Sequence, residues 1–164
     1  MNVMAIDPGT EQSAVLSWDG ERVISATIMP NLTLLHALSA LPREQEPDVI
    51  GIEMIASYGM SVGREVFETC VMIGRFFERA PITPRLIYRR DVKLHHCQSA
   101  RAKDTNIRQA LIDKYGAPGT KKNPGALYGI KSHLWAALAI ATFITETEAG
   151  NNHHEKAFSA SAQI

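Results

Sequence analysis

The first 28 residues hold three strand-like segments separated by turn signals. Residues 3–6 form a short apolar run that ends in Asp7-Pro8-Gly9-Thr10. Residues 13–18 and 21–28 lie on either side of Asp19-Gly20, and an Asp-Gly pair between two such segments is a strong signal of a β-hairpin. Three antiparallel strands are therefore the simplest interpretation of this region.

Helix-like and strand-like segments alternate in the part that follows. Asn31 is predicted to cap a helix whose leucines recur at helical spacing until Pro42. Residues 48–53 return as a buried strand that ends in Glu53. Residues 64–79 form a predicted helix, and the apolar residues expected to make its buried stripe are Val66, Cys70, Ile73 and Phe77.

The second half continues the alternation. Residues 85–88 form a short strand, and Asp104 is predicted to cap a helix that ends near Gly116. Residues 133–145 form a last helix, whose many alanines suit close packing against a sheet. This order predicts an α/β fold. We expect one domain over residues 1–149 and a disordered tail over residues 150–164, which lack periodicity.

Two of the predicted strands end in a carboxylate, Asp7 and Glu53. If these strands are neighbours in one sheet, the two side chains meet at one edge, where their like charges repel unless a cation holds them. Carboxylates together with a substrate phosphate are the usual ligands of Mg²⁺. Each acid taken alone also suits an ordinary turn, and it is the pair that favours a metal site.

The formal net charge of zero conceals an uneven distribution. Residues 1–74 carry a net charge of −7, residues 75–131 carry +9, and residues 132–164 carry −2. Such asymmetry favours a polyanionic partner, although most charged runs form only a solvated face. Basic residues predicted to contact phosphates are Arg89, Arg90, Lys93, Lys103, Lys121 and Lys122. Tyr58, on a loop after Glu53, is predicted either to stack on an unpaired base or to pack on a helix.

Three further side chains leave alternatives open. His133 opens the last predicted helix and can offer a ring nitrogen to the ion, although a histidine at a helix start is more often a surface residue. Asp104 is favoured as a cap, with a further acid near the metal as the alternative. Trp135, like Phe67 and Phe143, lies at core spacing and is assigned only packing.

Cysteines and apolar runs indicate the compartment. Cys70 and Cys97 have no paired spacing and are expected to be free thiols in a reducing cytoplasm. No stretch of eighteen apolar residues exists, so we expect no membrane span, and Asp7 interrupts the amino-terminal apolar run, so we expect no export signal. His95 and His96 lack a spacing that would build a zinc site with the cysteines.

Three motifs in order resemble the RuvC family of Holliday junction resolvases, within the RNase H-like superfamily. They are Ala5-Ile-Asp-Pro-Gly-Thr10, Ile50-Gly-Ile-Glu53 and His133-Leu-Trp-Ala-Ala-Leu-Ala-Ile-Ala141. The segments 58–70 and 103–112 look most like the RuvC-like endonucleases of bacteriophages and prophages. A phage-encoded protein would act in the cytoplasm of its bacterial host.

The resemblance implies a five-stranded mixed sheet flanked by helices and cleavage of branched DNA by two Mg²⁺ ions, with Mn²⁺ as a substitute. Asp7 would bind both ions, Glu53 one of them, and His133 would take the place of a family Asp or His. Products would carry 5′-phosphates. It also implies a homodimer, formed through the helix over residues 64–79, with Tyr58 near the crossover of the junction.

One departure from the family pattern is Ala136, which stands where members usually have a second helical acid. Either three protein ligands suffice, or Asp104 moves in, or a second ion binds weakly. The leading interpretation is a metal-dependent, structure-selective endodeoxyribonuclease that resolves Holliday junctions. The alternative is a catalytically weak or inactive branched-DNA-binding protein. A third interpretation, an ATP-handling relative of the sugar kinases, rests on residues 7–10 alone.

Overall fold

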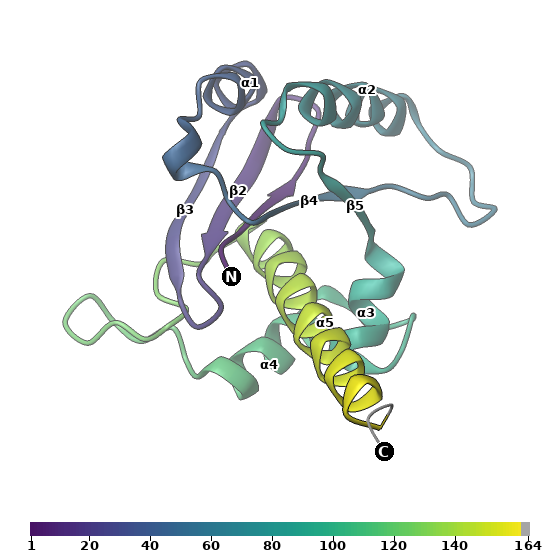
Figure 1. Cartoon of the computed structure of the whole chain (residues 1–164). Coiled ribbons are helices and arrows are strands. Elements are labelled where there is room, and N and C mark those ends of the chain that lie inside the picture. The colour runs from purple at the N-terminus through teal and green to yellow at the C-terminus, as the bar shows by residue number, and fades with distance from the viewer. Residues whose placement is uncertain (162–164) are drawn as a thin grey trace.

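The computed structural model describes the backbone of residues 1–161 and the side chains of residues 1–150, and its centre is a five-stranded sheet of order β3-β2-β1-β4-β5 (Figure 1). β1 pairs antiparallel with β2, and β2 with β3, whereas β4 runs parallel to both β1 and β5. The predicted mixed α/β sheet is thereby confirmed. The strands are β1 Val3–Asp7, β2 Gln12–Trp18, β3 Val23–Pro30, β4 Val49–Met54 and β5 Arg85–Tyr88.

Helices cover both faces of the sheet (Figure 1). α1 and α2 lie together on one face, and the long α5 crosses the other face with α3 and α4 beside it. A short 3₁₀ turn, Arg43–Gln45, precedes β4. None of the helices in the described residues has the length and apolar character needed to cross a bilayer. The helices are α1 Asn31–Ser39, α2 Arg64–Arg79, α3 Arg89–Cys97, α4 Asp104–Tyr115 and α5 Leu134–Ser161.

Side-chain alternation along the strands divides the core into two parts. Ala5 and Leu16 point into the cluster under α5, while the neighbouring Ile6 points into the cluster under α1 and α2. Gly51 in β4 allows α5 to approach closely, because a Cβ at this position would lie 2.4 Å from Cδ1 of Ile144. The alanine-rich helix therefore lies close against the sheet, as its composition predicts.

The two helices on the first face differ in detail from the sequence prediction. α2 has the predicted bounds, but its buried residues are Thr69, Met72, Ile73 and Phe76, so the stripe is rotated by about one position. Val66 and Cys70 are only half-buried, and Phe77 is 37% exposed. Phe67 is 62% exposed, so its assignment to packing is wrong. α2 therefore presents aromatic side chains to solvent.

The last helix is longer than predicted. α5 continues to Ser161, past the predicted end at residue 145. Residues 162–164 lie outside the described part of the chain. The division into a domain over residues 1–149 and a disordered tail over residues 150–164 stays a prediction.

Candidate active site

Asp7 and Glu53 lie side by side at the carboxyl ends of neighbouring parallel strands. Ile6 of β1 pairs with Ile52 of β4, so the two acids are the next residues on adjacent strands. Their side chains are only 15% and 14% exposed, respectively. The two carboxylates lie close together, as the sequence suggested. They stand at the carboxyl ends of the strands, where α/β folds commonly bind ligands.

The turn after Asp7 is fixed by a buried hydrogen-bond network. Asn31 Nδ2 donates to the carbonyl oxygens of Gly9 at 2.9 Å and Thr10 at 3.0 Å. Ser13 Oγ donates to Asn31 Oδ1 at 2.7 Å and accepts a hydrogen bond from the Gly9 N–H. The prediction that Asn31 caps α1 is wrong, because the helix begins at this residue without a side-chain cap and its amide holds the turn after Asp7 instead.

His133 reaches the same edge from the start of α5. Its Nδ1 lies 3.2 Å from Asp7 Oδ2, and its side chain is 74% exposed. Asp7 and His133 are 126 positions apart in the sequence. Ala136 lies one turn further along the helix, beside Asp7 and His133, and offers no ligand atom.

Arg89 joins two acids of the site. Its Nη1 donates to Glu53 Oε2 at 3.1 Å, and its Nη2 lies 2.6 Å from Asp104 Oδ1. Asp104 does not cap α4, contrary to the favoured prediction. Lys103 occupies the cap position, and its N–H donates to the side chain of Asn106 at 2.9 Å. Asp104 is thereby free to pair with Arg89.

These side chains surround one open cavity of about 350 Å³. Trp135 also lines it, so the assignment of Trp135 to packing alone is incomplete. The guanidinium of Arg108 on α4 lies 4.9 Å from the Trp135 ring centre, a cation–π contact that holds this wall. The lining residues are Asp7, Glu53, Arg89, Asp104, Ser132, His133, Trp135 and Ala136.

Burial makes two adjacent charges costly at this edge. Burial raises the pKa of Glu53 to about 7; Arg89 opposes the rise and the neighbouring Asp7 adds to it. Burial also raises the pKa of Asp7, against the opposing effect of His133 and Arg89. At neutral pH the pair therefore favours either a shared proton or a bound cation, and carboxylate oxygens beside an imidazole suit a divalent ion.

The predicted DNA-contacting residues fall into separate groups. Arg90 on α3 lies over the Tyr58 ring, 6.0 Å from its centre, and Tyr58 is 56% exposed. Tyr58 and Gly59 have φ of 48° and 85°, a tight turn in the left-handed region that projects the ring. Arg89 lies inside the cavity, Lys93 is half-buried on α3, and Lys103 adjoins Asp104.

Lys121 and Lys122 lie in a different part of the molecule. They belong to the segment between α4 and α5, which projects on the opposite side from the loop between β4 and α2 (Figure 1). An isolated bridge between Gly119 and Pro124 shapes this segment. The basic residues of the segment 75–131 therefore do not form one continuous patch.

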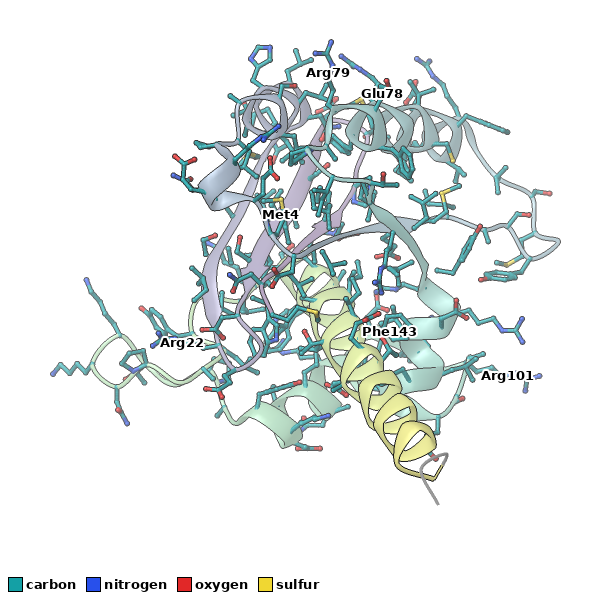
Figure 2. The ribbon with its side chains drawn as sticks, in the orientation of Figure 1. Met4, Arg22, Glu78, Arg79, Arg101 and Phe143 are labelled. Carbon is teal, nitrogen blue, oxygen red and sulfur yellow. The ribbon has the colours of Figure 1, made fainter. Side chains whose placement is uncertain are left out.

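A second polar cluster joins α3, α4 and α5 away from these residues. Ligand atoms of His95, His96 and Glu146 lie within 4.8 Å of one another. However, Glu146 already accepts from Tyr115 at 2.6 Å and pairs with Lys114 at 2.6 Å. Phe143 packs edge-on against His95 on the side of α5 that faces α3 (Figure 2). The ammonium of Lys114 and these contacts account for the cluster as a network that ties the three helices together.

Sequence reasoning missed Asn31, Ser13 and Trp135 as parts of the site. A polar pair buried at the start of β2 and of α1 gives no periodic signal, because its partners are backbone carbonyls. For Trp135 a signal was present, since it lies between His133 and Ala136 in the third motif. A side chain within a site motif is a better candidate for the site wall than for the core.

No family model matches the sequence, and no curated protein matches it. RuvC from Thermus thermophilus, in complex with a Holliday junction substrate, is similar with a TM-score of 0.62 over 92% of this chain and 96% of its own, at 16% identity. A second T. thermophilus RuvC structure has a TM-score of 0.59 over 92% and 97%, at 19% identity. The chain has the RuvC fold.

The RuvC fold confirms the resemblance at the level of architecture. The match extends over almost the whole chain, so it includes α5 as well as the sheet. At this identity the likeness concerns the fold and leaves the activity to be argued from the site. The bacteriophage or prophage type stays a prediction.

Proposed function

We propose that the protein is a metal-dependent, structure-selective endodeoxyribonuclease that cleaves branched DNA such as Holliday junctions. The observation that carries the proposal is the buried pair of Asp7 and Glu53, with His133 at 3.2 Å from Asp7, at the mouth of an open cavity in a RuvC fold. A RuvC of the same fold has been solved with a Holliday junction. The protein would act in the cytoplasm.

The donor set fits a divalent cation, Mg²⁺ by preference and Mn²⁺ as a substitute. Asp7, Glu53 and His133 would hold it, because an imidazole meets two mostly buried carboxylates that lie side by side. When bound, such an ion would activate water and stabilise the charge on a phosphodiester; with the 3′ oxygen as the leaving group, the products would carry 5′-phosphates.

The chain's own residues position the DNA. Asn31 and Ser13 fix the turn that carries Asp7, so its carboxylate is held in place before substrate arrives. Trp135, held by its cation–π contact with Arg108, forms one wall of the cavity. Arg90, Lys93 and Lys103 would bind phosphates near the site, and the exposed Tyr58 would stack on a base at the branch point. Lys121 and Lys122 would contact a more distant arm.

We also propose that two copies act together. Val71 on α2 is 64% exposed, and it lines a groove of about 490 Å³ between α1 and α2 with Leu32, which is 61% exposed. Glu78 and Arg79 lie at the end of α2 next to α1 (Figure 2) and supply charges at the rim. A second copy would cover this face, and a two-fold dimer presents paired sites to the paired strands of a junction.

One observation favours a second candidate function. Ala136 removes a ligand position from the cavity, which suits a protein that binds branched DNA and cuts it weakly or not at all. Calorimetric titration with Mg²⁺ and Mn²⁺ separates the two candidates, since a binding protein without a nuclease site takes up neither ion.

The deciding experiment uses end-labelled synthetic four-way junction, fork and linear duplex DNA of the same sequence. Each is incubated with the full chain in Mg²⁺, Mn²⁺ or EDTA. We expect cleavage of the junction in either metal and none in EDTA, with ligatable 5′-phosphate ends. Tight binding to the junction without cleavage in either metal would support the second candidate.

A further inference from the structure

A fixed cation already lies within the candidate site. The Arg89 guanidinium contacts the buried Glu53 at 3.1 Å and the Asp104 carboxylate at 2.6 Å, and it lines the cavity with Asp7. Its side chain is 26% exposed, whereas that of Asp104 is 73% exposed. The guanidinium is therefore held between an inner carboxylate and an outer one.

The charges of the site suffice for one divalent ion rather than two. Two such ions side by side bring twice the charge that the pair of Asp7 and Glu53 neutralises. Asp104 adds a negative charge and Arg89, 2.6 Å from it, adds a positive one, so these side chains together carry the charge that balances one divalent ion. Ala136 adds none. Because buried charge must be compensated within the site, a second ion would have only phosphate oxygens of the DNA as anionic ligands.

We infer that the site takes a single divalent ion and that Arg89 replaces the second ion as a fixed cation for the DNA phosphate. This inference rests on the proposed nuclease function and replaces the two-ion arrangement that the sequence resemblance implies. A guanidinium carries five N–H donors, and the two ion pairs use two of its nitrogens, so donors remain for phosphate oxygens. Arginine binds phosphate in this forked manner.

The first test counts bound ions in the wild-type protein. Mn²⁺ is titrated into the full chain, alone and with a four-way junction made of phosphorothioate-linked strands, while electron paramagnetic resonance and calorimetry report the stoichiometry. We expect one Mn²⁺ per chain with the spectrum of an isolated ion. Two ions per chain with an exchange-coupled spectrum would overturn the inference.

The second test removes the guanidinium and uses its neighbour as a matched control. R89Q and R90Q delete the same charge one residue apart, but only Arg89 contacts Glu53, while Arg90 lies over Tyr58. We expect R89Q to bind Mn²⁺ roughly tenfold more tightly, because a nearby positive charge is lost, and R90Q to bind it as the wild type does. Unchanged or weaker binding by R89Q contradicts the inference.

The third test separates binding from catalysis. At saturating Mn²⁺, R89Q should cleave the junction at least about 100-fold more slowly than the wild type, since a preorganised positive charge beside the phosphate is gone, and R89K should recover part of the rate. Cleavage by R89Q at the wild-type rate would contradict the inference.

The outcomes for the wild-type protein separate this inference from the proposed function. A wild-type protein that binds no Mn²⁺ and cuts no DNA refutes the proposed function. Two bound ions together with cleavage refute only the single-ion inference.

Discussion

Asp7 and Glu53 show how pairing and burial change the properties of two ordinary acids. Neither residue is unusual in the sequence, and each follows an apolar strand. The parallel pairing of β1 with β4 places them side by side, and burial then raises the pKa of both carboxyls. A turn acid open to water would gain neither effect, so the pairing is what distinguishes this site from a turn.

Replacing Asp7 by Asn tests the role of this carboxylate. D7N removes a ligand charge without altering the basic residues that would bind DNA. We expect cleavage of a four-way junction to fall at least about 1,000-fold, while gel-shift affinity for the same junction in EDTA stays within about twofold. Cleavage at the wild-type rate, with EDTA making no difference, would contradict the metal mechanism.

Glu53 gives the metal-free protein a pH-dependent stability. Its pKa rises from 4.5 to about 7 on folding, so the folded protein binds the proton more tightly than the unfolded chain. The stabilisation by the protonated form is complete below pH 4.5 and is lost as the pH rises through about 7. In EDTA at about pH 8, E53Q should therefore be more stable than the wild type by about 1–3 kcal/mol.

Chemical denaturation at several pH values checks this expectation. The advantage of E53Q should shrink towards about pH 5, where the wild-type carboxyl keeps its proton. E53D keeps the charge and serves as the control. An E53Q protein with no stability gain at the higher pH would show that burial does not raise the pKa of the Glu53 carboxyl. E53Q should also lose cleavage, so that stability and activity change in opposite directions.

At the scale of elements, the contact between α5 and β4 depends on a single missing methyl group. A Cβ on Gly51 would lie 2.4 Å from Ile144 Cδ1 and 2.9 Å from Ile140 Cγ2, both on α5. We expect G51A to lower the free energy of unfolding by about 1–3 kcal/mol through overpacking, measured by urea denaturation. G74A is the control, because Gly74 lies at an exposed position of α2 and an added Cβ there meets no atom within 4 Å. Its free energy of unfolding should be unchanged or slightly higher.

The elements were largely predictable because their signals are local. The hairpin with Asp19-Gly20 and the bounds of α2 follow from turn chemistry and periodicity. The face that each helix buries was less predictable, as the rotated stripe of α2 shows, because neighbours in three dimensions select the buried side. Asn31 and Asp104 were misjudged for one reason. Each stands at the start of a helix, as a cap residue would, but its side chain pairs with a group elsewhere in the fold. Asn31 donates to backbone carbonyls of the turn after Asp7, and Asp104 pairs with Arg89.

For the whole molecule, the overall charge of zero is the sum of unlike regions. The basic segment includes α3 beside the site and the projecting loop between α4 and α5, so the proposed DNA contacts would extend over more than one side. The outer face of α1 and α2, with the exposed Leu32, Phe67 and Val71, lies on the other side of the sheet from α5. This is the face that the proposed second copy would cover.

Placing charges on this face tests the dimer. The double variant F67D/V71D changes two side chains that are 62% and 64% exposed, so the fold should tolerate it. We expect the wild type to sediment as a dimer and the variant as a monomer that cuts the two strands of a junction independently. I24D changes an equally exposed residue of β3, 58% exposed, and should stay dimeric. A wild-type monomer at micromolar concentration would refute the proposed assembly.

The candidate site draws on almost the entire length of the chain. Asp7 comes from the first strand and His133 from the start of the last helix, 126 positions later, and the alanines and leucines that follow His133 fill the core beneath the sheet. A nascent chain still on the ribosome therefore lacks both the complete candidate site and a finished core until α5 emerges. Products of translation that stop before α5 would therefore lack part of the proposed nuclease site.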